Sequence, residues 1–284
     1  MITVLGGLGA AVLFATATVS AARGSRLVGA ESFLAGVMTV GLVIAVPFVA
    51  LGGGKPATGL DFSTLGWLAL SGIGNVAGLL LDYAALRVGR LGLVAPILAT
   101  EGAIAALISV AAGERLAPGA AATLVLIAAG VVLATRTGSR DVDASDQSRR
   151  AVLLALAAAC SFGVSLYATG RVSAQLPLAW ALLPARLVGV AAVALPLAFT
   201  GRLRLTRRAA PWVVLAGAGE VGGFAAFAVG ARHGIAISAV LSSQFATLAA
   251  LAGVVLFRER LGRAQFAGVA AVACGVAILS SLQS

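Results

Sequence analysis

The chain consists of apolar stretches of helical length that are separated by short polar segments. A window of about 19 residues finds ten such stretches, at residues 2–22, 32–51, 65–86, 91–112, 117–134, 151–169, 176–199, 210–230, 235–257 and 264–282. About 20 mainly apolar residues in a helix are enough to cross the hydrocarbon core of a bilayer. The pattern therefore predicts ten transmembrane helices, and the polar segment 136–150 separates them into two sets of five.

The composition excludes an ordinary soluble protein. Hydrophobic residues make up 60% of the chain and charged residues 11%, with a mean hydropathy of +1.06, whereas soluble domains are about 45–50% apolar and about 25% charged. The net charge of +10 is spread in small basic groups between the apolar stretches, so we expect no nucleic-acid partner. We predict an all-α integral membrane protein whose surroundings are the lipid bilayer.

The two halves of the sequence are similar to each other. A shift of 145 residues, without a gap, places 87–89 (Arg-Val-Gly) on 232–234 (Arg-His-Gly) and the Glu-Arg-Leu triplet 114–116 on 259–261. A shift of 148 residues places Phe14 on Phe162. Because five is an odd number, the second copy must enter the membrane from the opposite side. We therefore predict two inverted-topology repeats, residues 1–135 and 151–284, joined by the linker 136–150, an arrangement typical of secondary transporters.

These repeated stretches, 83–133 and 228–278, also carry a family resemblance. Each contains Arg-x-Gly, an apolar helix, Glu-Arg-Leu and a final helix with glycine, and the sequence resembles the EamA family of the drug/metabolite transporter superfamily. The resemblance implies a ten-helix carrier with a central cavity between the halves. Such proteins often carry an arginine in the second helix of each half; Arg186 keeps it in the second half, whereas Val37 stands at the aligned position of the first.

The predicted function is secondary active transport. We expect the protein to move, and to export, a small metabolite such as an amino acid or drug-like compound across the plasma membrane by alternating access, with protons as the coupling ion. The single histidine, two separated cysteines and lack of nucleotide-binding or metal-binding motifs predict no enzyme activity, no cofactor and no metal site. Alternatives are a flippase for a lipid-linked intermediate and an intramembrane enzyme. The oligomeric state is left open.

Charged residues within the apolar stretches are the first candidates for a functional site, because each costs about 2.5–3.5 kcal/mol on insertion scales. Glu101 lies at the middle of the fourth stretch, has no basic residue near it in sequence, and follows Pro96, which can bend the helix. We predict that Glu101 is the main coupling acid. The alternative is a protonated glutamate that donates a hydrogen bond between helices.

Glu220 and Arg186 lie at similar depth in neighbouring stretches. They are interpreted either as an ion pair that joins two helices or as functional groups, with Arg186 holding a substrate carboxylate and Glu220 serving as a second coupling acid. Asp82 lies closer to a membrane face and to Arg87 and Arg90, and is interpreted as a solvated boundary charge.

Weaker candidates are polar or aromatic residues in the same stretches. Asn75 aligns with Glu220 under the shift of 145 residues, and Gln244 and Ser243 form a polar patch in the ninth stretch. Phe162 and Tyr167 give the sixth stretch an aromatic surface. Each of these side chains is a candidate for substrate contact, with packing or hydrogen bonding between helices as the alternative.

Overall fold

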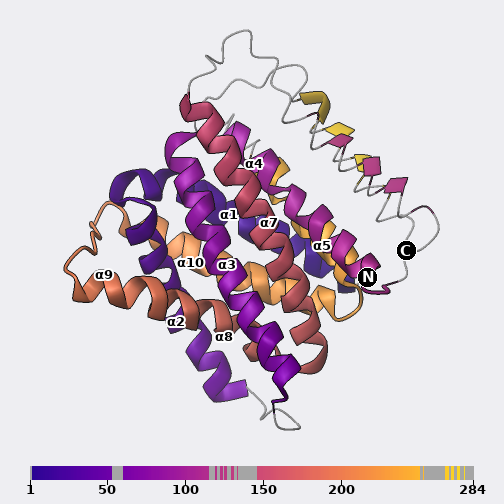
Figure 1. Cartoon of the computed structure of the whole chain (residues 1–284), viewed down its shortest axis with the longest axis horizontal. Helices are drawn as coiled ribbons and strands as arrows, with labels where there is room; N and C mark the ends of the chain where they lie inside the picture. The colour runs from indigo at the N-terminus through magenta and orange to yellow at the C-terminus, as the bar shows by residue number, and fades with distance from the viewer. Residues whose placement is uncertain are drawn as a thin grey trace.

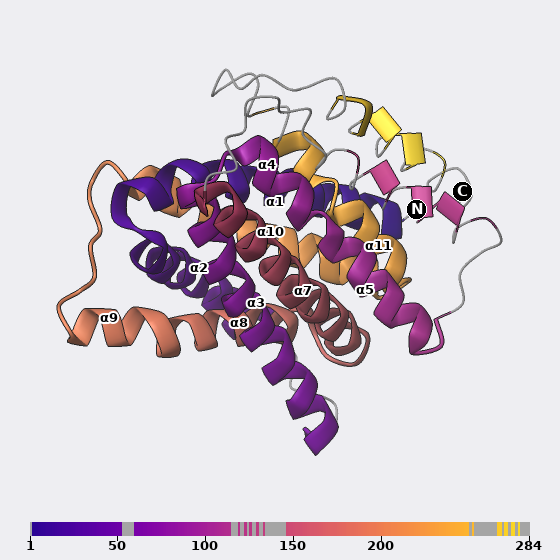
Figure 2. The same ribbon diagram turned by 45° about the horizontal axis from the view of Figure 1, so that its top comes forward.

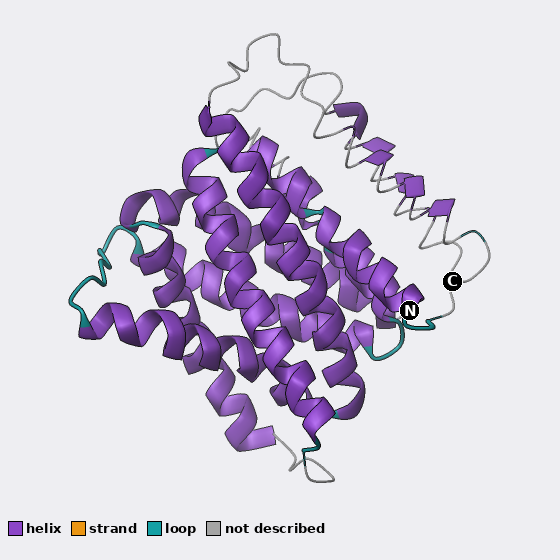
Figure 3. Cartoon of the chain, viewed as in Figure 1, coloured by secondary structure: helices purple, strands orange, loops and turns teal. Residues whose placement is uncertain are grey.

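The computed structural model describes residues 2–52, 60–114 and 146–249, together with isolated residues between 119 and 133 and between 252 and 278. Within these residues every regular element is a helix (Figure 3). The elements, in chain order (Figure 1), are α1 Ile2–Val28, α2 Ala30–Gly52, α3 Phe62–Val88, α4 Leu91–Leu98, α5 Thr100–Ala111, α7 Asp146–Gln175, α8 Leu178–Gly189, the π-helical segment Val190–Ala194, α9 Leu195–Phe199, α10 Ala210–Ala231 and α11 Ile235–Ser242.

Seven described segments are long and apolar enough to cross a membrane: Ile2–Val28, Ala30–Pro47, Phe62–Val88, Leu93–Ala111, Arg149–Gln175, Leu178–Phe199 and Ala210–Ala231. The prediction of an all-α membrane protein is therefore confirmed. The ninth predicted stretch contains a shorter apolar helix, Ile235–Ala249. More than half of the residues in each of the predicted stretches 117–134 and 264–282 lie outside the described residues, so the count of ten remains a prediction.

Helices of the first half pack against helices of the second half in reciprocal pairs. The two most extensive contacts join α1 to α10 and α3 to α7, and the views of Figures 1 and 2 show α3 and α7 side by side. In the same way, α2 packs on α10, and α8 packs on α3. Two further pairs, α2 with α8 and α5 with α11, each join one helix from either half. The core thus lies between the two halves of the chain.

Glycine makes the closest of these contacts possible. A Cβ atom at Gly223 of α10 would lie 2.4 Å from the ring of Phe14 on α1, and one at Gly78 of α3 would lie 2.6 Å from the ring of Phe162 on α7. Real Cβ atoms do not approach other heavy atoms so closely, so each phenylalanine ring occupies a notch that only glycine leaves open. The shifts that align the two halves carry one pair onto the other.

Regular helix is interrupted at two equivalent positions. One interruption is Ala99, between α4 and α5, and the other is at Ser243 and Gln244, after which helix resumes at Phe245. Ala99 falls on Gln244 under the shift of 145 residues. Nearby side chains donate to carbonyl oxygens of the preceding turn: Thr100 Oγ1 to Ile97 (2.7 Å), Ser242 Oγ to Ala239 (2.9 Å) and Gln244 Nε2 to Val240 (3.1 Å). Interrupted helices at membrane depth need such partners.

Candidate functional site

A small cavity lies at the junction of the two halves, beside both interruptions. Its volume is about 30 Å³, and we call it the carboxyl cavity; it is lined by Phe14 and Thr18 of α1, Leu79 and Asp82 of α3, Leu98 of α4, Glu101 of α5, Phe162 and Leu166 of α7, Glu220 and Phe224 of α10, and Phe245. A space of this size holds one or two water molecules. A larger molecule can enter only if the helices move apart.

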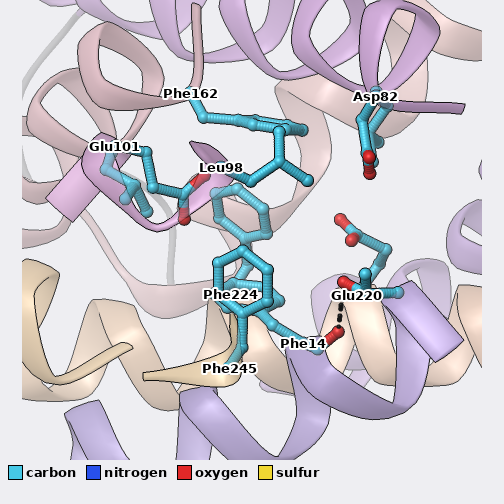
Figure 4. Close-up of a pocket in the computed structure, with 11 residues that line it drawn as sticks. Phe14, Asp82, Leu98, Glu101, Phe162, Glu220, Phe224 and Phe245 are labelled. Atoms are coloured by element: carbon cyan, nitrogen blue, oxygen red, sulfur yellow. Dashed lines mark hydrogen bonds between the residues drawn. The ribbon is translucent and has the colours of Figure 1, made fainter. Parts of the chain in front are cut away.

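Glu101 reaches the cavity from the first turn of α5, directly after the interruption at Ala99. Its side chain is buried, and among the described residues no hydrogen bond or ion pair holds its carboxyl group. The interruption follows Pro96 by three residues; proline lacks the N–H that would continue the regular bonding. Glu101 is therefore an unpaired carboxyl in largely apolar surroundings (Figure 4).

Asp82 also lines the cavity, so its interpretation as a solvated boundary charge is wrong. The residue is buried, and its Oδ1 atom has no hydrogen-bond partner. Arg87 and Arg90, which were expected to share its surroundings, are exposed. The sequence did contain a sign of this position. Asp82 lies seven residues, or two helical turns, after the buried Asn75, so both side chains lie on one face of α3.

Glu220 faces Asp82 across the cavity. Figure 4 shows the carboxyl groups of Asp82 and Glu220 pointing toward one another, with Glu101 on the other side of the phenylalanine rings in this view. All three carboxyl-bearing side chains, Asp82, Glu101 and Glu220, line the carboxyl cavity. They come from α3, α5 and α10, so helices of both halves contribute.

Arg186 of α8 forms an ion pair with Glu220. The Nη2 atom lies 3.7 Å from Glu220 Oε2, and both side chains are buried. This distance exceeds that of a good hydrogen bond, and neither Arg186 Nε nor Glu220 Oε2 has a hydrogen-bond partner. Arg186 also donates to Met38 Sδ at 3.6 Å and lies 5.9 Å from the ring centre of Phe224. The structure thus contains the pair that was one of two interpretations of these residues.

Among the weaker candidates, Asn75 lies beside a cavity residue, whereas Ser243, Gln244 and Tyr167 do not line the cavity. Asn75 is fully buried beside Glu220, and its amide has no hydrogen-bond partner. Ser243 Oγ and Gln244 Nε2 donate to the carbonyl of Val240, so these groups support the interrupted helix rather than line the cavity. Tyr167 packs edge-on against Trp67, with ring centres 5.7 Å apart, and is not among the lining residues.

Phenylalanine rings form most of the apolar lining. Phe162 was a candidate from the sequence, and Phe14 aligns with it in the first half. Phe224 and Phe245 were missed, because a phenylalanine in an apolar stretch does not differ in sequence from one that faces lipid. Phe14 lies edge-on to both, with ring centres 5.3 Å and 6.4 Å apart.

The charge balance limits what the cavity can do. With all three carboxyl groups ionised and Arg186 charged, two negative charges remain uncompensated among these four residues. Unpaired charge in an apolar interior is very costly, so the cavity must hold protons or a cationic ligand. No group of three or more His, Cys, Asp or Glu side chains suited to a metal ion occurs in the described part of the chain.

Comparisons with known proteins give a family for the first half of the chain and a similar fold for nearly all of it. Residues 1–136 match the model of the EamA-like transporter family, which confirms the family resemblance seen in the sequence. A solved structure, described only as the crystal structure of a protein, has 21% sequence identity and a TM-score of 0.75 and covers 99% of this chain and 96% of its own; at this identity the likeness concerns the fold alone. No match is found among curated proteins. The family match and the seven apolar helices indicate a membrane transporter of the drug/metabolite kind.

Proposed function

We propose that this chain, whose first half matches the EamA-like transporter family, is a secondary transporter of the plasma membrane. It moves a small metabolite or drug-like compound by alternating access, exports it, and uses protons as the coupling ion. The observation that carries this proposal is the carboxyl cavity, where three acidic side chains from both halves line one small space.

We further propose that the chain forms ten membrane helices in two inverted five-helix repeats, 1–135 and 151–284. The reciprocal contacts of α1 with α10 and of α3 with α7 support this architecture. The matching notches of Phe14 at Gly223 and of Phe162 at Gly78 support it as well. Two similar halves around one site can rock against each other, so that the site opens to one side of the membrane and then to the other.

The buried, unpartnered carboxyl group of Glu101 supports proton coupling. An ionised carboxyl group without a partner is unstable in these largely apolar surroundings, whereas a protonated one is neutral. When the cavity opens to water, the proton can leave and a substrate can take its place. Exchange of one for the other links the proton gradient to substrate movement, and no nucleotide-driven step is needed.

Proteoliposomes provide the test of this function. The purified chain is reconstituted with a pH-sensitive dye inside, and compounds are added outside one at a time: an aromatic amino acid, a basic amino acid, a nucleoside, a sugar and phenethylamine. We expect at least one compound to drive proton movement in vesicles with protein beyond that in empty vesicles. Equal proton movement in both kinds of vesicle for every compound would contradict the proposal.

A further inference from the structure

We infer that the carboxyl cavity binds a protonated primary amine attached to an aromatic or similarly flat apolar body. This inference names the substrate class of the same site and so rests on the proposed transport function. It depends on three features of the cavity: its unpartnered acceptor atoms, its excess of negative charge and its phenylalanine lining.

The unpartnered atoms call for a ligand that donates hydrogen bonds. Asp82 Oδ1 is buried and has no hydrogen-bond partner, and the Glu101 carboxyl group has none among the described residues. Ionised carboxylates accept hydrogen bonds and cannot donate them, whereas a primary ammonium group carries three donors. One such group can therefore satisfy acceptors from more than one helix.

The charges around the cavity disfavour a ligand that carries a carboxylate. The ionisable side chains that face it or lie behind it are Asp82 and Tyr83 of α3, Glu101 of α5, Arg186 of α8 and Glu220 of α10. Arg186 is the one cation in this set, and it is already paired with Glu220. A zwitterionic amino acid would place its carboxylate among carboxyl groups without a free cation to hold it. The corresponding amine lacks this conflict.

The lining fits the rest of such a molecule. Phe14, Phe162, Phe224 and Phe245, with three leucines, form most of the remaining wall. The T-shaped packing of Phe14 with Phe224 and Phe245 is the arrangement that aromatic rings prefer, and a further ring can join it when the helices part. Aromatic faces also attract a cation that lies over them.

Charge balance makes the exchange simple. The amine enters as R–NH₃⁺, a protonated carboxyl group of the cavity releases H⁺ to water, and the carboxylate that remains pairs with the ammonium group. No covalent bond other than this O–H bond breaks, and the total charge of the cavity is unchanged. Amine and proton therefore compete for the same carboxyl groups.

Four ligands that share one body test the inference by titration of the purified wild-type protein. They are phenethylamine, L-phenylalanine, phenethyl alcohol and N,N,N-trimethylphenethylammonium. We expect phenethylamine to bind about tenfold or more tightly than each of the others, since hydrogen bonds to charged groups are the strong ones. Binding should be tighter at about pH 8 than at about pH 6, because the amine stays protonated at both values while fewer protons compete. Each binding event should release a proton to an unbuffered solution.

Variants locate the interaction. Asp82→Asn should weaken phenethylamine binding by about fivefold or more and leave phenethyl alcohol binding unchanged. Glu31→Gln, at an exposed carboxyl group near the start of α2, is the matched control and should bind as the wild type does. If Asp82→Asn does not fold, Glu101→Gln replaces it, and the comparison of the four ligands does not depend on either variant.

The outcomes separate this inference from the proposed function. Tighter binding of L-phenylalanine or of the trimethylated cation than of phenethylamine would overturn the primary-amine assignment. The assignment is also overturned if none of the four ligands binds while another compound drives proton movement in vesicles. In that case the proposed transport function is retained. If no compound drives proton movement, the proposed function fails together with the inference.

Discussion

The guanidinium group of Arg186 lies 3.7 Å from the carboxylate of Glu220, and the pair joins α8 to α10 inside the membrane region. Removal of one partner leaves a buried charge without compensation, at a cost of about 3–5 kcal/mol. We therefore expect Arg186→Leu and Glu220→Gln each to lower the melting temperature of the purified protein. The double variant should recover part of the loss. Thermal unfolding in detergent measures all three, and losses that simply add in the double variant would contradict a direct pairing.

The notch at Gly223 predicts sensitivity to a single methyl group. Gly223→Ala places its Cβ 2.4 Å from the Phe14 ring if nothing moves, and overpacking of this kind costs about 1–3 kcal/mol. The control is Gly66→Ala in α3, where a Cβ meets nothing within 4 Å and alanine favours helix by about 0.5–1 kcal/mol. We expect the melting temperature to fall in the first variant and to hold or rise in the second.

A second substitution checks the cause. Phe14→Leu should relieve the loss in Gly223→Ala, because a smaller side chain leaves room for the methyl group. Gly78→Ala should behave like Gly223→Ala, with Phe162→Leu as its partner. If Gly78→Ala and Gly223→Ala melt as the wild type does, the two notches are not close-packed.

Glu114 connects the end of α5 with the start of α11. Its two carboxylate oxygens accept from the N–H of Ala236 at 3.2 and 3.3 Å, in the first turn of that helix. Loss of such a cap costs about 0.5–2 kcal/mol. Glu114→Ala should lower the melting temperature, and Glu114→Gln, which keeps an acceptor oxygen, should retain most of the stability. Equal losses in both variants would show that charge, rather than the hydrogen bond, matters here.

Asp61 gives a pH dependence outside the membrane. It caps α3 by accepting from the backbone N–H of Thr64 at 3.0 Å, and hydrogen bonds from Thr64 and Ser63 lower the pKa of its carboxyl group below the usual 3.8. Because the pKa of Asp61 is lower in the folded than in the unfolded protein, its ionised form stabilises the fold at pH values above the unfolded-state pKa. This stabilisation is lost as the pH falls through the folded-state pKa. The advantage of wild type over Asp61→Ala should therefore shrink below about pH 4. An advantage that grows as pH falls would contradict this sign.

The helices and their approximate ends follow from the sequence because apolar length is a strong local signal. The stretch predicted at 65–86 forms α3, Phe62–Val88, and that at 210–230 forms α10, Ala210–Ala231. The sequence also places Glu101 and Glu220 near the middle of apolar stretches, and both side chains are buried in the structure. What remained open is which face of each helix turns inward.

Asp82 shows why the site could be predicted only in part. Its distance along the sequence from Arg87 suggested shared surroundings, but five residues along a helix turn the two side chains to different faces. Whether Asp82 meets Glu220 depends on how α3 and α10 pack, and no local pattern encodes that contact. Gln244 is the opposite case. It is a polar residue in an apolar stretch, but its side-chain amide donates to the carbonyl of Val240 on its own helix and does not line the cavity.

Glu101→Gln tests the central claim, that a carboxyl group in this cavity couples protons to transport. The variant keeps the shape of the side chain and removes its titration. It is reconstituted beside wild type and the control Glu31→Gln, and uptake of the compound that the wild type transports is followed with and without a pH gradient. We predict that the gradient stimulates uptake in the wild type and in Glu31→Gln but not in Glu101→Gln, although that variant remains folded and retains some, weaker binding of the compound. Stimulation of Glu101→Gln equal to that of the wild type would contradict the assignment of Glu101 as the coupling acid.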